Sequence, residues 1–255
     1  MSSIAENVKS IKQRVAEAAV RSGRAPEDVR LCAATKMNDA SRVREAIAAG
    51  VDICGENRVQ ELSEKFEQGA YEGCPLHFIG HLQKNKVKYL VGKVQLIESV
   101  DCLELLETID KRAKSMGLVQ DVLLEVNIGG EVAKSGFAPG ELAGCLPQMG
   151  QFSSIRVRGL MAIPPICEKT EEIRPYFRAM KQLFVDNGAK KYDNVSMDFL
   201  SMGMSADALS EDSDLNLGRT GVVLVGLVCL YNGGLGLFGD HNDTPFMIFI
   251  YPMAK

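Results

Sequence analysis

The stretch VRLCAATKMNDASRVREAIAAGVDIC, residues 29–54, contains one complete unit of the fold. The apolar run at residues 29–35 predicts a buried strand, and apolar residues at helical spacing predict a helix over residues 41–49. Gly50 is a typical stop signal for that helix, and residues 51–54 return to a strand-like pattern. A strand, a helix and a second strand in this order are typical of a parallel sheet.

The same alternation extends over most of the chain, beginning with an amphipathic helix over residues 4–22. Further strands are predicted at residues 76–79, 94–100, 122–128, 155–163 and 197–202, and further helices at 59–68, from 86, 103–116, 139–147 and 170–187. Repeated strand–helix units in one domain favour an α/β fold that closes into a single (β/α)8 barrel of the TIM type. A doubly wound open sheet is the alternative.

Composition narrows the class of protein. The chain has 255 residues, and its formal net charge of -4 gives no overall basic field for nucleic acid or anionic lipid. The longest apolar run, residues 222–230, is shorter than the roughly 20 residues that span a bilayer. Neither nucleic acid nor a membrane is therefore an expected partner. The seven cysteines include no C-x-x-C pair, which favours a reducing cytoplasm.

Functional sites of such barrels lie at the carboxyl ends of the strands, and Lys36 follows the first predicted strand. An amine at this place is partly shielded from water, which favours the neutral form that condenses with carbonyl groups. The other interpretation is a side chain that extends from the strand end into solvent. Position alone favours that second interpretation, because most lysines lie at the surface.

The segment Gly203-Met204-Ser205 follows the seventh predicted strand. A glycine allows backbone N–H groups to approach an anion, and a serine hydroxyl adds a donor, so the segment could hold a phosphate. An ordinary turn with Ser205 as a helix cap is the alternative. His77 and His81 lie four residues apart across a strand end, which is poor geometry for a metal site, and no metal is expected.

Several motifs in order along the chain are far more specific together than singly. They are ATK (34–36), CGENRVQE (54–61), HFIGHLQKNK (77–86), KSG (134–136), RGLMAIP (158–164) and LSMGMSAD (200–207). With these motifs the chain closely resembles the pyridoxal 5′-phosphate (PLP) homeostasis protein family. That family shares the PLP fold-type III barrel of the alanine racemase N-terminal domain.

The resemblance implies a cofactor site for PLP in three parts. Lys36 corresponds to the lysine that binds PLP as a Schiff base. Asn57, His77 and Met161 correspond to residues that line the pocket. Gly203, Met204 and Ser205 correspond to the phosphate cup.

The resemblance weakens after Asp207, so the eighth strand and the C-terminal tail are atypical. The family usually ends in a strand that reads roughly V-R-I-G-T-x-I-F-G, onto which Arg219 and Gly221 can be laid. Arg219 would then face the pyridine nitrogen and Gly221 would join the phosphate cup, whereas Val222 replaces a phosphate-binding threonine. We predict a barrel domain over residues 1–230 and an atypical tail over residues 231–255. Residues 220–230 are the favoured substitute strand, and the alternative is a barrel that stays unclosed.

The function implied by the resemblance is non-catalytic. Members of the family are expected to be cytoplasmic monomers that carry or buffer PLP and deliver it to apo forms of PLP-dependent enzymes. The first alternative is an amino-acid racemase or decarboxylase on the same barrel. The second is a PLP-free barrel enzyme that acts on a phosphorylated metabolite through the same glycine-lined cup.

Overall fold

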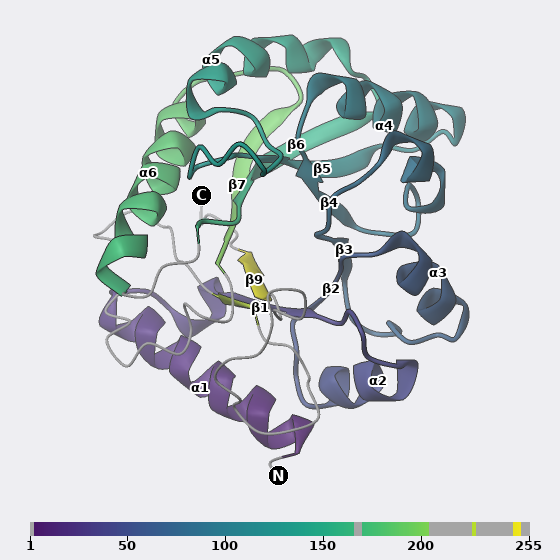
Figure 1. The fold of residues 1–255 in the computed structure, drawn as a ribbon, viewed down its shortest axis with the longest axis vertical. Coiled ribbons are helices and arrows are strands. Elements are labelled where there is room, and N and C mark those ends of the chain that lie inside the picture. Colours follow the sequence, from purple (N-terminus) through teal and green to yellow (C-terminus); the bar gives the residue numbers. More distant parts are fainter. Residues whose placement is uncertain (1–2, 166–169, 204–225, 228–246, 251–255) are drawn as a thin grey trace.

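The computed structural model describes residues 3–165, 170–203, 226–227 and 247–250. Seven parallel strands follow one another around a curled sheet in chain order, and helices surround them as an outer ring (Figure 1). These strands are β1 (Arg30–Ala34), β2 (Ile53–Glu56), β3 (Leu76–Phe78), β4 (Leu96–Val100), β5 (Gln120–Glu125), β6 (Ile155–Ala162) and β7 (Val195–Met202). The open-sheet alternative is therefore wrong, because the sheet curls around a common interior.

The helices cover the outside of the strands. They are α1 (Ile4–Arg21), α2 (Ala40–Ala48), α3 (Val59–Glu67), α4 (Leu103–Ser115), α5 (Leu142–Cys145) and α6 (Thr170–Gly188). Short 3-10 turns lie at η1 (Pro26–Asp28), η2 (Lys84–Tyr89), η3 (Pro139–Glu141) and η4 (Leu146–Gln151). The predicted elements are confirmed to within a few residues, except that residues 84–89 form the 3-10 turn η2 where an α-helix was expected from residue 86.

Local sequence explains where the helices begin. Ser3 and Glu6 form a capping box at the start of α1, in which each side chain accepts the backbone N–H of the other residue. Asp39 caps α2 by accepting the N–H groups of Ser41 and Arg42. The hydrogen bonds from Ser41 and Arg42 keep the pKa of the Asp39 carboxyl below its ordinary value. The Asp39 cap fixes the point at which the chain, having left β1, enters the outer ring of helices.

The gap between β7 and β1 is filled by the strand β9 (Met247–Ile250). It runs antiparallel to both neighbours, with Phe249 opposite Leu31 on one side and Met202 on the other. The expectation that residues 220–230 take this place is wrong: within them only β8 (Gly226–Leu227) is described, and it pairs with β9. The run at 247–250 is rich in aromatic and branched residues, which favour strands, whereas Gly226 interrupts the other run.

This antiparallel closure keeps β1 from being an open edge. Because β1 leads directly to Lys36, the pairing with β9 also fixes the strand that carries the candidate amine. The division into a barrel of residues 1–230 and a tail of residues 231–255 stays a prediction, although residues 247–250 belong to the sheet.

Candidate functional site

Lys36 lies two residues beyond the carboxyl end of β1, as its predicted place at the strand end requires, and its side chain is half-buried. Thr35 before it is fully buried, whereas Met37 after it is exposed and has a φ of 59°, in the left-handed region. A residue other than glycine is uncommon in that region, and such strain concentrates at functional sites. The amide of Asn38 donates to the carbonyl oxygen of Lys36 at 2.9 Å. The backbone around the amine is thus held in one specific shape.

The interior of the barrel contains a buried polar chain that joins three strands. His77 Nδ1 lies 2.7 Å from Glu98 Oε1, and the Ser201 hydroxyl donates to Glu98 Oε2 at 2.6 Å. Glu98 and Ser201 are fully buried, and His77 nearly so. His77 was predicted to line the pocket, whereas no role was predicted for Glu98 or Ser201. The available signal was an acidic residue inside the apolar strand LIESV, residues 96–100.

Asn57 follows β2 and has a buried Oδ1 atom without a hydrogen-bond partner in the part of the chain that the structure describes. A buried acceptor of this kind is costly unless a ligand or water satisfies it. Its backbone is in close contact with Gly80, where an added Cβ would lie 2.1 Å from the Asn57 carbonyl oxygen. Only glycine at residue 80 therefore permits the observed position of Asn57.

Met161 and Gly203 complete the predicted residues that the structure describes. Met161 in β6 is fully buried and pairs in register with Ser201, so it lies beside the polar chain. Gly203 is buried directly after β7 and has a φ of 114°, which favours glycine. Met204, Ser205, Arg219 and Gly221 lie outside the described residues, so most of the expected phosphate cup stays a prediction.

Acidic and basic groups meet at the carboxyl ends of β4 and β5. Burial, together with the nearby Asp101 carboxylate, raises the pKa of Glu125 to about 7, and Lys134 partly opposes that rise. The Lys134 Nζ lies 3.1 Å from the carbonyl oxygen of Pro164. His81 is exposed and lies 3.3 Å from Asp101 Oδ2, so it has a different carboxylate partner from His77. The two histidines thus belong to separate hydrogen-bonded groups.

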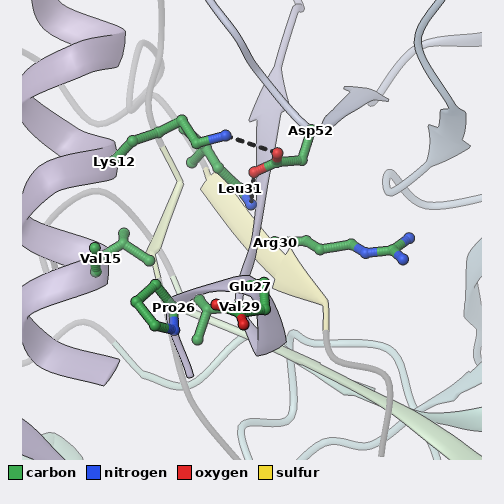
Figure 2. A pocket seen from close by; sticks show the side chains of 9 residues that line it. Lys12, Val15, Pro26, Glu27, Val29, Arg30, Leu31 and Asp52 are labelled. Atoms are coloured by element: carbon green, nitrogen blue, oxygen red, sulfur yellow. Dashed lines mark hydrogen bonds and ion pairs between the residues drawn. The ribbon is translucent and has the colours of Figure 1, made fainter. Parts of the chain in front are cut away.

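A cavity of about 420 Å³ lies at the opposite, amino-terminal end of β1 (Figure 2). Lys12 from α1 crosses it to reach Asp52 Oδ1 at 2.7 Å, and Asp52 Oδ2 accepts the backbone N–H of Leu31 at 2.8 Å (Figure 2). In barrels of this type the amino-terminal face serves stability. The Lys12–Asp52 pair fits that role because it ties α1 to the start of the sheet.

Within the described part of the chain, no helix combines the length and the apolar character needed to cross a membrane.

The fold and the site define a class of protein. Residues 1–228 match the family model described as the alanine racemase N-terminal domain. Among curated proteins, the pyridoxal phosphate homeostasis protein of Aquifex aeolicus is 40% identical over 222 residues, which cover 87% of this chain and 96% of that relative. The protein of the same name from Pseudomonas aeruginosa is 39% identical over 210 residues, covering 81% and 87%. The chain belongs to the pyridoxal phosphate homeostasis protein family.

Solved structures agree with this assignment. PipY of Synechococcus elongatus PCC7942, solved with PLP bound, is 32% identical with a TM-score of 0.65, covering 77% of this chain and 90% of PipY. An unknown protein from Bifidobacterium adolescentis is 33% identical with a TM-score of 0.76, covering 84% of this chain and 90% of that protein. Alanine racemase of Clostridium difficile shares the fold at 14% identity and a TM-score of 0.61, covering 82% of this chain but 52% of the racemase.

Proposed function

We propose that this protein binds PLP covalently through Lys36 and acts in intracellular PLP homeostasis as a carrier or buffer. The names of its relatives and the PLP bound to PipY support the proposal. The observation that carries it is the half-buried Lys36 just beyond the carboxyl end of β1, in a barrel where Asn57, directly after β2, has a buried acceptor without a partner among the described residues.

The described residues fit this cofactor. PLP, when bound, supplies an aldehyde that condenses with an amine and a ring that can accept electron density. Lys36 offers the amine, and Asn57 Oδ1 offers an acceptor that has no partner among the described residues. Glu98 holds the ring of His77 in a fixed orientation inside the barrel. The proposed phosphate cup consists of the backbone of Gly203 with Met204, Ser205 and Gly221, and Arg219 is proposed to face the pyridine nitrogen.

We further propose that the protein is a monomer without catalytic turnover of its own. Its relatives are named for homeostasis, and the matched region covers only 52% of the C. difficile racemase, so nearly half of that enzyme has no counterpart in the match. Arg219, if it faces the pyridine nitrogen, can only donate to it. The ring nitrogen then stays unprotonated, and the cofactor is a weaker electron sink. A racemase or decarboxylase is the alternative.

The proposed recipients are apo forms of PLP-dependent enzymes, and the proposed location is the cytoplasm. The five described cysteines are free thiols, which suits a reducing compartment.

The test is a spectroscopic titration with PLP followed by assays of amino-acid turnover. Wild-type protein should develop the absorbance band of a Schiff base, and Lys36→Ala should lose it while keeping weaker non-covalent binding through the phosphate. Lys84→Ala, which removes an exposed lysine, is the matched control and should titrate as wild type. Racemisation or decarboxylation of common amino acids that disappears in Lys36→Ala would replace the carrier proposal with an enzymatic one.

A further inference from the structure

A buried charged cluster lies directly behind the backbone of Lys36. We call it the Lys65 cluster. Its members are Thr35 just after β1, Glu56 in β2, Glu61 and Lys65 in α3, and Tyr71 after α3. Lys65 is only 6% exposed, although it lies on a helix that could direct a lysine to solvent. A lysine buried in this way requires partners for its charge.

Lys65 finds an acceptor for each of its three N–H donors. Its Nζ lies 2.7 Å from the carbonyl oxygen of Thr35 and 2.7 Å from Glu56 Oε1. Glu61 Oε2 is the third acceptor, at 3.4 Å. An ammonium has three donors and no acceptor, so this arrangement uses all of them.

Glu56 connects Thr35, the residue before Lys36, to Lys65 and Tyr71. Its Oε1 atom accepts the Thr35 hydroxyl at 2.6 Å and the Tyr71 hydroxyl at 2.8 Å, in addition to Lys65. Burial, reinforced by the charge of Glu56, raises the pKa of Tyr71, so its hydroxyl stays protonated and donates at neutral pH. Thr35 is therefore held by both its hydroxyl and its carbonyl oxygen.

Met37, the residue after Lys36, is linked to the Lys65 ammonium through the Glu61 carboxylate. The backbone N–H of Met37 donates to Glu61 Oε2 at 2.8 Å, the oxygen that also faces Lys65. This hydrogen bond holds Met37 in its left-handed conformation, with φ at 59°. Both neighbours of Lys36 are thus fixed from one point, Thr35 directly and Met37 through Glu61.

Stability alone does not explain such a cluster. Desolvating an ion pair is costly, and apolar residues of similar volume often stabilise a protein equally well or better. A cluster that fixes one backbone segment is useful where a reacting group on that segment must be held in one orientation. Lys36 is the residue between the two fixed positions.

We propose that Lys65 is a positioning residue for Lys36. Together with Glu56 and Glu61 it holds the backbone at residues 35–37 so that the amine of Lys36 is directed into the cofactor pocket. The inference rests on the proposed function, because it requires Lys36 to be the amine that PLP binds. In that condensation a C–N double bond forms to the aldehyde carbon, and the carbonyl oxygen leaves as water with two protons from the amine.

Glu61→Ala is the sharpest test because it releases Met37 while keeping the buried Lys65–Glu56 pair. Glu64→Ala is the matched control: it lies on the same helix, removes the same charge and is exposed. Affinity is measured for PLP and for pyridoxine 5′-phosphate, which lacks the aldehyde. In Glu61→Ala we expect PLP affinity to fall by about tenfold, the equivalent of about 1.4 kcal/mol. Affinity for pyridoxine 5′-phosphate should stay unchanged, and Glu64→Ala should match wild type for both ligands.

Unchanged PLP affinity in Glu61→Ala would overturn the proposal, and so would an equal loss for both ligands, which indicates general damage to the pocket. The double variant Lys65→Met/Glu56→Gln removes the buried charges together, and it should show the same selective loss of PLP binding. If that variant does not fold, the result with Glu61→Ala decides. Borohydride labelling of the wild type on a lysine other than Lys36 would identify failure of the proposed function itself.

Discussion

His77 Nδ1 and Glu98 Oε1 lie 2.7 Å apart inside the barrel, where Glu98 is fully buried. The second carboxylate oxygen of Glu98 accepts the hydroxyl of Ser201 from β7. One side chain of β4 therefore links β3 to β7 through the barrel interior. It also fixes the orientation of the His77 ring, because Nδ1 is engaged with the carboxylate.

Replacing Glu98 with leucine should destabilise the protein. The donors of His77 and Ser201 would both lose their acceptor in a buried place, and each such loss costs about 1–3 kcal/mol. Urea unfolding at neutral pH measures the difference. Glu104→Leu is a control on an exposed residue, whose ion pair with Lys84 is expected to contribute little. A Glu98→Leu protein as stable as the wild type would show that the hydrogen bonds of His77 and Ser201 to Glu98 are not important for stability.

Glu125 should make stability depend on pH. Its pKa is raised from 4.5 to about 7, so the native state retains this proton over a range in which the unfolded state releases it. The free energy of unfolding therefore falls as the pH rises from about 4.5 to 7. Glu125→Gln removes this effect and should be more stable than wild type at pH 8, on the order of 2 kcal/mol, with little difference near pH 4.5.

Urea unfolding of both proteins at these two pH values gives the comparison for Glu125. Glu107→Gln, on an exposed position of α4, is the control and should not alter the pH profile. A constant stability difference between wild type and Glu125→Gln across the range would contradict the assignment.

Gly80→Ala should damage the candidate site. The new Cβ would lie 2.1 Å from the carbonyl oxygen and 2.6 Å from the Cα of Asn57, and backbone atoms cannot move aside as a flexible side chain does. We expect a loss of stability of about 1–3 kcal/mol and weaker PLP binding. Gly140→Ala is the control because its Cβ meets nothing within 4 Å. Normal PLP affinity in Gly80→Ala would show that the position of Asn57 is not important for the site.

Val222→Thr tests the departure of the chain from the usual family ending. If Val222 occupies the place of the phosphate-binding threonine, the new hydroxyl adds a hydrogen bond to a charged group, which contributes about 1.5–3 kcal/mol. PLP should then bind more tightly, as measured by equilibrium dialysis. Val223→Thr is the neighbouring control and should have no effect. Equal affinity in all three proteins would show that Val222 does not face the phosphate.

Strand and helix periodicity was enough to predict most of the barrel. Apolar runs bounded by stop signals such as Gly50 placed β1 through β7 and most helices to within a few residues. The closing strand was predicted wrongly. Two apolar runs in the tail, residues 222–230 and 247–250, could pair with β7 and β1. The residues within a run do not show which strands it will pair with, so the choice could not be made from the sequence.

The candidate site residues at strand ends could be proposed from the sequence, whereas the buried groups beside them could not. Lys36, Asn57 and His77 became candidates through their positions and the family motifs. The Lys65 cluster was missed, although Lys65 shares helical spacing with the buried Val59 and Leu62, which is the signal that it faces inward. Three other members of the cluster, Thr35, Glu56 and Tyr71, lie outside α3, and only the folded chain brings them together.

Borohydride reduction of the protein saturated with PLP, followed by peptide mapping, tests the central claim most directly. Reduction converts a Schiff base into a stable secondary amine, so the pyridoxyl group remains on the lysine that held it. The account predicts the label on the peptide that contains Lys36, with no label on that peptide in Lys36→Ala. A label on a different lysine, or no label at saturating PLP, would contradict it.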